Sequence, residues 1–269
     1  MNKHYYMINR LKNLRLHLSD TWEVLSGKRN PMVPPKRIVN INGGDDIKIG
    51  ETFLKYFIEH GDLGTKSDIL DVGSGFGRMA VPLTGFLSTK CRYEGIELIP
   101  DGVDWCTKKI TSKFNNFKFR KIDVKNGRYN PNGKFSASEY KFPFDDQSFD
   151  FIILTSVFTH MLPSDLENYL SEISRVLRPN GKCFITYFLL NNESISLVEN
   201  GKSTFNLKYN FEDCRIENEE DPEYVIAYNE KIIIDLYRKY NLKITSSFYG
   251  SWCGRFYFTD FQDIVIGVK

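Results

Sequence analysis

The chain has few of the features that mark secreted, metal-binding or membrane proteins. Its five cysteines are scattered through 269 residues without C-x-x-C spacing, so neither a disulfide framework nor a zinc site is predicted. No stretch approaches the roughly 20 apolar residues of a membrane-spanning helix. Residues 1–20 also lack the uninterrupted apolar core of a signal peptide. We therefore expect a cytoplasmic protein with no metal ion and no membrane partner.

An excess of charge of one sign is also missing. The 36 basic and 34 acidic residues leave a net charge of +2, whereas nucleic-acid binding requires a concentrated basic face. No nucleic-acid partner is therefore expected. The chain is 41% hydrophobic, which is enough to bury one substantial core.

The chain does contain a glycine-rich loop between a buried strand and a helix. Residues 69–72 (ILDV) form a short, mainly apolar run typical of a strand in a parallel sheet. Gly73, Gly75 and Gly77 follow at every second position, and residues without a Cβ let the backbone turn sharply and approach a ligand. The sequence therefore predicts a nucleotide-binding loop after this strand.

Two carboxylates indicate which nucleotide is bound. The spacing G-x-G-x-G is one residue shorter than the dinucleotide fingerprint G-x-G-x-x-G, which holds a pyrophosphate. Asp71 would repel phosphate but could pair with a cationic amino-acid group. Glu97 lies 22 residues after Gly75, where such folds place the acid that binds the ribose hydroxyls. A ligand with an adenosine, an amino-acid tail and no phosphate is S-adenosylmethionine, which we predict as the cofactor.

Five segments resemble the class I S-adenosylmethionine-dependent methyltransferases. Residues 68–77 look like the family's first motif, Glu97 like its ribose-binding acid, and residues 119–124 like the strand that ends in the adenine-contacting residue. Residues 142–161 look like the fourth-strand motif, and residues 169–188 like the helix, turn and fifth strand that follow it. The resemblance runs from about Ile49 to Tyr187 and resumes at the C-terminal strands. The long fourth motif, with SVFTHM, is also similar to bacterial methyltransferases of surface-polysaccharide biosynthesis.

Alternating strand and helix patterns predict an α/β, Rossmann-like fold with a mostly parallel sheet covered on both faces. Strands are expected near 69–72, 92–96, 117–122, 149–155 and 182–189, and helices near 49–60, 77–88, 101–113 and 164–177. The resemblance implies a helix near 224–240 and an antiparallel pair of edge strands at 243–249 and 263–268. These complete a seven-stranded sheet with an antiparallel C-terminal edge.

Two segments outside this core are expected to cover the site. Residues 1–30 carry apolar side chains at spacings of three or four, which predicts a helix. We divide the chain into an N-terminal helical cap and linker, residues 1–48, and a methyltransferase core, residues 49–269. Residues 190–222 are polar and irregular, and we interpret them as a lid inserted over the active site.

The resemblance implies a cofactor site at the carboxyl ends of the first four strands. The predicted residues are Asp71, Gly73, Ser74, Gly75, Glu97, Leu98, Asp123, Val124 and Thr155. Asp123 is predicted to accept a hydrogen bond from the adenine, but it could instead cap the turn that follows. Because residues 126–140 separate it from the fourth-strand motif, Ala137 to Glu139 compete for the adenine contact.

His160 is the candidate catalytic residue. It follows the fourth strand by a few residues, at the ligand-binding end of the sheet. Histidine has an unperturbed pKa near 6.5 and can accept a proton from a hydroxyl as a methyl group is transferred. The alternative is a structural cap on the turn at residues 162–164, since methyl transfer can proceed mainly by positioning two reactants in line.

Residues outside the common core are predicted to recognise the methyl acceptor. They are Tyr6, Arg37, Tyr187, Asn191, Trp252 and Arg255. Aromatic and amide groups suit a sugar-like ligand, and arginine grips phosphate or carboxylate in bidentate fashion. The set favours a small polar or anionic acceptor as the partner molecule.

These observations predict a methyltransferase that acts on an oxygen, or as a less favoured option a nitrogen, of a small polar metabolite. Two alternatives stay open. One is a non-catalytic S-adenosylmethionine-binding partner protein. The other is a nicotinamide-dependent oxidoreductase, which the short glycine spacing and Asp71 disfavour.

Overall fold

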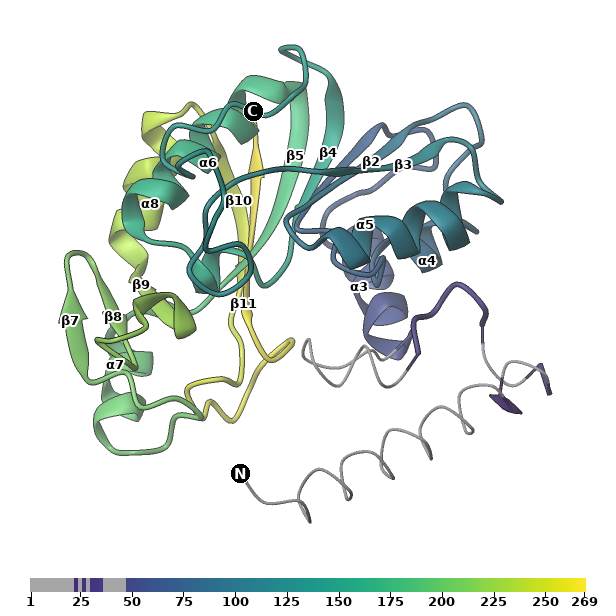
Figure 1. The fold of residues 1–269 in the computed structure, drawn as a ribbon. Helices are drawn as coiled ribbons and strands as arrows, with labels where there is room; N and C mark the ends of the chain where they lie inside the picture. The colour runs from purple at the N-terminus through teal and green to yellow at the C-terminus, as the bar shows by residue number, and fades with distance from the viewer. Residues whose placement is uncertain (1–21, 24–25, 28–29, 36–46) are drawn as a thin grey trace.

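The computed structural model of the chain describes residues 22–23, 26–27, 30–35 and 47–269 (Figure 1). The predicted helix over residues 1–30 falls largely outside this part of the chain, and Tyr6 and Arg37 fall wholly outside it. The helical cap and these two acceptor-binding residues stay predictions.

A seven-stranded sheet forms the centre of the molecule. Its strands are β1 (Ile69–Val72), β2 (Tyr93–Glu97), β3 (Phe117–Lys121), β4 (Phe149–Leu154), β5 (Leu177–Tyr187), β10 (Lys243–Phe248) and β11 (Asp263–Val268). Their order across the sheet is β10-β11-β5-β4-β1-β2-β3. Only the two pairs that contain β11 are antiparallel, which confirms the predicted mostly parallel sheet.

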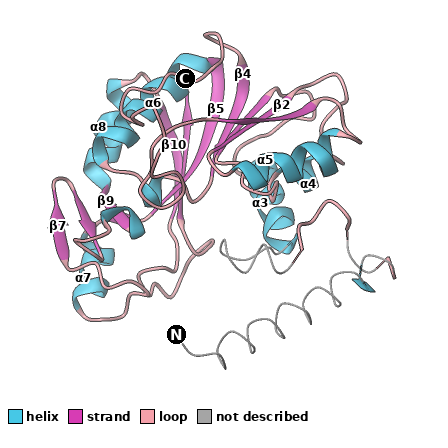
Figure 2. Cartoon of the chain, in the orientation of Figure 1, coloured by secondary structure: helices cyan, strands magenta, loops and turns pink. Residues whose placement is uncertain are grey.

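Helices cover both faces of this sheet (Figure 2). One group comprises α3 (Ile47–Glu59), α4 (Ala80–Leu83) and α5 (Pro100–Cys106), and the other α6 (Pro163–Val176) and α8 (Glu230–Lys239). Successive strand residues point to opposite faces, so Leu70 packs in the core with α6 and α8, and Ile69 in the core with α3 and α4. No helix in the described part of the chain is long and apolar enough to cross a membrane.

The predicted lid is more regular than its composition indicated. Residues 190–222 contain α7 (Asn192–Glu199), β7 (Tyr209–Phe211) and β8 (Cys214–Ile216). The two strands join β6 (Leu189–Leu190) and β9 (Ile226–Asn229) in a second sheet of order β6-β9-β8-β7. Helix α7 begins at a capping box, in which the Asn191 side chain accepts from the Ser194 amide and the Ser194 hydroxyl accepts from the Asn191 amide.

Two predicted helices were placed too broadly. Residues 226–229 form strand β9, so α8 begins only at Glu230, where the Asn229 side chain accepts a hydrogen bond from the Lys231 amide at 3.0 Å. Near residues 77–88, the chain continues in turns until α4 begins at Ala80. Helix α5 ends at Cys106 and continues as a π-helix over Thr107–Thr111. Short 3-10 helices span Phe158–His160 and Pro222–Tyr224.

Candidate functional site

A cavity of about 550 Å³ lies at the carboxyl edge of the large sheet. Its wall includes residues at or after the ends of β1, β2, β3, β4 and β5, residues of α6, residues that precede β9 and β11, and Pro34. The chain leaves β1 for β2 on one side, and returns to β4 on the other. Such a reversal of strand order is where open α/β sheets bind ligands.

The glycine loop after β1 leaves room for a ligand at Gly75. Both Gly73 and Gly75 line the cavity and have positive φ angles, 80° and 53°. A Cβ on Gly73 would lie 2.4 Å from Cγ2 of Val157, whereas one on Gly75 would meet no protein atom within 4 Å. Gly73 is therefore needed for packing, and Gly75 leaves open space beside the backbone.

Glu97, at the end of β2, ties this loop to the next strand. Its Oε2 accepts from the Gly75 amide at 2.6 Å, and its Oε1 accepts from the amides of Leu98 and Ile99 at 2.7 and 2.9 Å. Burial raises the pKa of Glu97, and the three amide bonds oppose that rise. Because a carboxylate has about four acceptor positions, Glu97 can still accept from a ligand hydroxyl in the cavity that it lines.

Asp71 is not among the residues that line the cavity, and its predicted contact with the cofactor stays a prediction. The side chain is buried beneath the loop, where it accepts a hydrogen bond from the Tyr93 hydroxyl. Burial raises the pKa of Asp71 from its ordinary 3.8 to about 7. The carboxyl therefore links β1 to Tyr93 of β2 through Oδ2, and its Oδ1 has no hydrogen-bond partner in the described part of the chain.

The cavity beside β2 and β3 fits an adenosine. The apolar side chains of Leu98, Ile122, Val124 and Ala137 line it there. Ser74 also lines this cavity, while its Oγ is buried with no hydrogen-bond partner in the described part of the chain. Apolar walls for a base and a carboxylate with a free acceptor position suit the adenine and the ribose of S-adenosylmethionine.

Asp123 does not line the cavity either, and its predicted adenine contact is corrected. Its Oδ1 accepts from Nδ2 of Asn130 at 3.3 Å, and its Oδ2 lies 3.9 Å from the Lys134 ammonium. Both partners belong to the segment inserted before the fourth-strand motif. Asp123 thus holds that turn, as the alternative interpretation had it, and Ala137 takes a place in the wall.

His160 lines the cavity, and its ring is oriented by the backbone. Its Nδ1 lies 3.0 Å from the Glu223 carbonyl oxygen. A carbonyl can only accept, so Nδ1 carries the proton and Nε2 carries the lone pair when the ring is neutral. Burial lowers the pKa of His160 below 6.5, and this effect exceeds the opposing effect of the Glu223 hydrogen bond. The ring is therefore neutral at pH 7.

A second link holds the same wall together. Nδ2 of Asn126 donates to the His160 carbonyl oxygen at 3.2 Å and to Oε1 of Glu223 at 2.7 Å. Oε2 of Glu223 accepts from the Gly127 amide at 2.6 Å. Asn126, His160 and Glu223 all line the cavity, so one network connects the segment after β3, the segment after β4 and the 3-10 helix that precedes β9.

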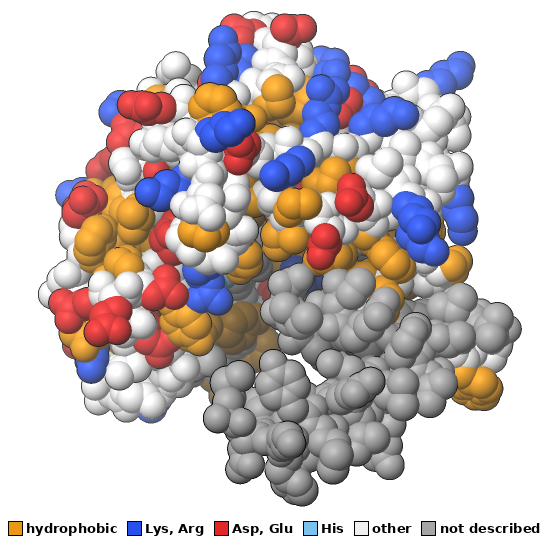
Figure 3. Space-filling model, in the orientation of Figure 1, with side chains coloured by type: hydrophobic (Ala, Val, Ile, Leu, Met, Phe, Trp, Pro, Cys, Tyr) orange, Lys and Arg blue, Asp and Glu red, His pale blue; other side chains and the backbone are white. Residues whose placement is uncertain are grey.

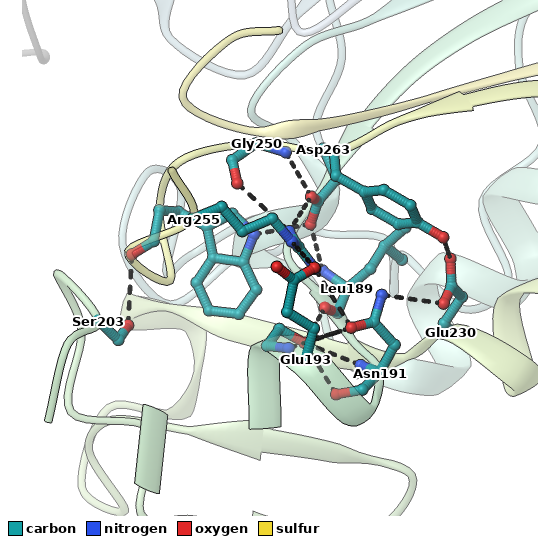
Figure 4. A network of polar contacts seen from close by, with 11 residues as sticks. Leu189, Asn191, Glu193, Ser203, Glu230, Gly250, Arg255 and Asp263 are labelled. Carbon is teal, nitrogen blue, oxygen red and sulfur yellow. Dashed lines mark hydrogen bonds and ion pairs between the residues drawn. The ribbon is translucent and has the colours of Figure 1, made fainter. Parts of the chain in front are cut away.

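Four residues predicted to bind the acceptor have structural roles instead, because none of them lines the cavity. Tyr187 is fully buried and its hydroxyl contacts that of Tyr237 at 3.1 Å. The other three belong to one polar network around Asp263: Arg255 and the Trp252 indole donate to Asp263, and Arg255 also donates to Asn191. Figure 4 shows Asn191, Arg255 and Asp263 in this network. Aromatic and cationic residue types suit a ligand site and a buried network equally well, and only burial distinguishes the two.

The remaining predicted cofactor residues, Ser74, Leu98, Val124 and Thr155, line the cavity with Gly73, Gly75 and Glu97. Sequence reasoning missed most of the far wall, which includes Phe188, Phe205, Phe261 and Gln262. Gln262 directly precedes β11. Because β11 is antiparallel to β5, the first residues of β11 lie at the edge of the sheet where the parallel strands end. This topology is a signal that could have identified Gln262.

Comparison with known proteins agrees with this geometry. Residues 70–185 match the model of a family described as a methyltransferase domain. An uncharacterized protein of Haemophilus influenzae is 27% identical over 161 residues, which cover 59% of this chain and 57% of that protein. The chain thus matches a little over half the length of this relative.

Solved structures of similar fold come from several organisms. A protein of Pyrococcus horikoshii OT3 has a TM-score of 0.56 at 17% identity and covers 86% of this chain and 93% of its own. A SAM-dependent methyltransferase of Methanosarcina mazei has a TM-score of 0.54 at 20% identity, with coverages of 79% and 96%. The 1,6-didemethyltoxoflavin-N1-methyltransferase of Burkholderia thailandensis, solved with S-adenosylhomocysteine, has a TM-score of 0.53 at 14% identity, with coverages of 100% and 91%. Residues 70–185, which contain the glycine loop and Glu97, thus match a methyltransferase domain, and these solved structures share the fold of the chain.

Proposed function

We propose that this protein transfers a methyl group from S-adenosylmethionine to an oxygen, or as a less favoured option a nitrogen, of a small acceptor molecule. One observation carries the proposal: a single cavity connects the glycine loop and Glu97 with the neutral imidazole of His160. A donor site and a proton acceptor in one enclosed space are what such a transfer requires.

The cofactor would be held by groups on the β1–β2–β3 side of the cavity. Glu97 would accept hydrogen bonds from the ribose, the backbone at Gly75 would allow close approach, and Leu98 and Val124 would contact the base. When bound, S-adenosylmethionine supplies an electrophilic sulfonium methyl group. The chain's own contribution is to orient the two reactants and to exclude water from the space between them.

His160 would act as the proton acceptor for a hydroxyl on the acceptor molecule. Its Nδ1–H is directed to the Glu223 carbonyl, which fixes the tautomer with the basic Nε2. Since burial keeps the pKa of His160 below 6.5, the base is unprotonated at neutral pH. The Glu223 carbonyl would stabilise the ring after it gains a proton.

The size of the cavity supports a small-molecule acceptor. Its volume of about 550 Å³ lies within the range of about 300–1,000 Å³ found for small-ligand sites. Lys125 and Arg128 also line it, which supports an acceptor that carries a carboxylate or phosphate, such as a sugar derivative used for surface polysaccharides.

On the described part of the face in Figure 3, basic side chains are interspersed with acidic ones, in keeping with no nucleic-acid partner. The five cysteines are free and buried, in keeping with a reducing cytoplasm.

The cofactor assignment is tested by calorimetric titration with S-adenosylhomocysteine. Glu97→Ala should weaken binding by about 1–3 kcal/mol, because the ribose loses its hydrogen-bond acceptor. Glu94→Ala is the matched control, since Glu94 lies on the same strand but pairs with Arg120 at 3.1 Å and does not line the cavity. An unchanged dissociation constant for Glu97→Ala would refute the ribose assignment.

The reaction itself is tested by transfer of labelled methyl groups from S-adenosylmethionine to fractionated small-molecule extracts. A labelled product identifies the acceptor and the methylated atom. Tight binding of S-adenosylhomocysteine with no labelled product in any fraction would favour the non-catalytic partner protein. Binding of NADH in its place would favour the oxidoreductase.

A further inference from the structure

The far end of the cavity is separate from the cofactor side. The glycine loop and Glu97 lie at β1 and β2, whereas the cavity also extends past β4 to β5 and β11. Phe188 directly follows β5, and Gln262 directly precedes β11. The pairing of Asp263 with Tyr187 brings these two residues to the same part of the carboxyl edge.

Three phenylalanine rings form one wall of this end. The ring centroid of Phe188 lies 5.0 Å from that of Phe205 and 6.0 Å from that of Phe261, and the centroids of Phe205 and Phe261 are 6.0 Å apart. All three residues line the cavity. Phenylalanine offers only apolar faces and edges, so the wall suits a flat apolar surface on a ligand.

Gln262 places hydrogen-bond donors beside these rings. Its Oε1 accepts from the Thr186 hydroxyl at 2.6 Å and from the Ser156 hydroxyl at 3.0 Å. The Thr186 oxygen also accepts from the Ser156 amide at 2.8 Å, and Gln262 Oε1 is the acceptor found for its own proton within the described part of the chain. The amide oxygen is therefore assigned to the end of Gln262 that faces both hydroxyls, with Nε2 at the other end. No hydrogen bond from Nε2 is found within the described part of the chain, and Gln262 lines the cavity.

One buried carboxylate holds both parts of this end in place (Figure 4). Asp263 accepts from the Leu189 amide and the Trp252 indole, each at 2.7 Å, and from the Arg255 guanidinium at 3.0 Å. Leu189 directly follows Phe188, and Asp263 directly follows Gln262. The network therefore fixes the backbone that carries the aromatic wall and the backbone that carries the amide.

We propose that Phe188, Phe205, Phe261 and Gln262 form an acceptor corner, which binds a ring-shaped acceptor. The ring has a flat apolar face that lies against the phenylalanines and, at its edge, a carbonyl, ring nitrogen or hydroxyl oxygen that accepts from Gln262 Nε2. An aromatic ring and a pyranose ring share this chemistry. The assignment of the bound ring as methyl acceptor depends on the proposed function.

The test uses the glutamine side chains of the whole chain as reporters. The sequence contains two glutamines, Gln147 and Gln262, so selective ¹⁵N labelling gives two side-chain amide signals. The protein saturated with S-adenosylhomocysteine is titrated with methyl 4-hydroxybenzoate as the aromatic probe and with methyl β-D-glucopyranoside as the pyranose probe. At least one should shift the Gln262 signal and leave the Gln147 signal in place, and the probe that does so identifies the ring type.

Gln262→Glu removes the donors but keeps an oxygen for Thr186 and Ser156. We expect this variant to bind the active probe about tenfold more weakly. Gln147→Glu introduces the same charge at an exposed position outside the cavity and should bind like wild type. The titration of wild-type protein needs no variant, so a Gln262→Glu protein that fails to fold does not remove the test.

Two results would overturn the acceptor corner: neither probe shifts the Gln262 signal at millimolar concentration, or Gln262→Glu binds the active probe as tightly as wild type. Failure of the proposed function looks different. In that case wild-type protein binds no S-adenosylhomocysteine, while a probe still shifts the Gln262 signal.

Discussion

Replacing Asp71 with asparagine is expected to stabilise the protein, and to do so more strongly above neutral pH than in mild acid. The pKa of Asp71 is raised by burial from its ordinary 3.8 to about 7. Between these two values the folded protein keeps a proton that the unfolded chain has lost. The free energy of unfolding therefore falls as the pH rises through this interval.

The size of the effect follows from the two pKa values. The difference between 3.8 and about 7, at 1.36 kcal/mol for each pH unit, corresponds to about 4 kcal/mol. This is the cost of ionising Asp71 beneath the glycine loop once the pH exceeds both values. Asparagine removes the charge, and its Oδ1 can still accept the hydrogen bond that Tyr93 donates to Asp71.

Urea unfolding curves of wild type and Asp71→Asn, followed by circular dichroism, measure the effect. At about pH 5, which already lies above the ordinary pKa of 3.8, the variant should be more stable by about 1.6 kcal/mol, and at about pH 8 by about 4 kcal/mol. Asp145→Asn, at an exposed position, controls for the loss of one negative charge. Other groups with a raised pKa, such as Asp263 at about 6, contribute equally to the free energy of unfolding of both proteins and cancel in the comparison. A difference between wild type and Asp71→Asn that is the same at both pH values would refute the reasoning.

The two remaining predictions concern catalysis and the glycine loop. Because burial holds the pKa of His160 below 6.5, the wild-type rate should rise with pH through that lower value and level off near neutrality. His160→Gln should lower the rate about a hundredfold or more without changing cofactor affinity, and a rate close to wild type would leave His160 with a structural role only. Gly75→Ala should weaken S-adenosylhomocysteine binding, since its Cβ would enter the cavity at a position with φ of 53°. Gly201→Ala is the control, because Gly201 also has a positive φ, 67°, and open space around its Cβ position but lies outside the cavity. Both variants should lose about 1–2 kcal/mol of stability from the strained backbone, but Gly201→Ala should bind S-adenosylhomocysteine as wild type does. Equal affinities for the two variants would mean that no ligand approaches Gly75.

The parallel core could be predicted because its signals are local. The run at residues 69–72, the three glycines after it and the carboxylate of Glu97 are contiguous or regularly spaced in the sequence. Each of these segments indicates the same structural position, a buried strand or the loop at its carboxyl end, in any open α/β sheet. The mostly parallel sheet and the position of the cavity at its carboxyl edge follow from them.

The second sheet and the acceptor side could not be predicted in the same way. Strands β7 and β8 have three residues each, which is too short for a periodic pattern to be recognised, and β6 is paired with β9 from far along the chain. Trp252 and Arg255 were assigned to the acceptor by residue type alone. Their burial depends on Asp263, a partner that local sequence does not identify.

The match to the family model ends at residue 185, before Phe188, Phe205, Phe261 and Gln262. The proposed cofactor residues thus lie within the matched stretch of the chain, and the proposed acceptor corner lies beyond it. Recombination downstream of the fifth strand could exchange the set of compounds that become methylated while the donor chemistry is inherited intact.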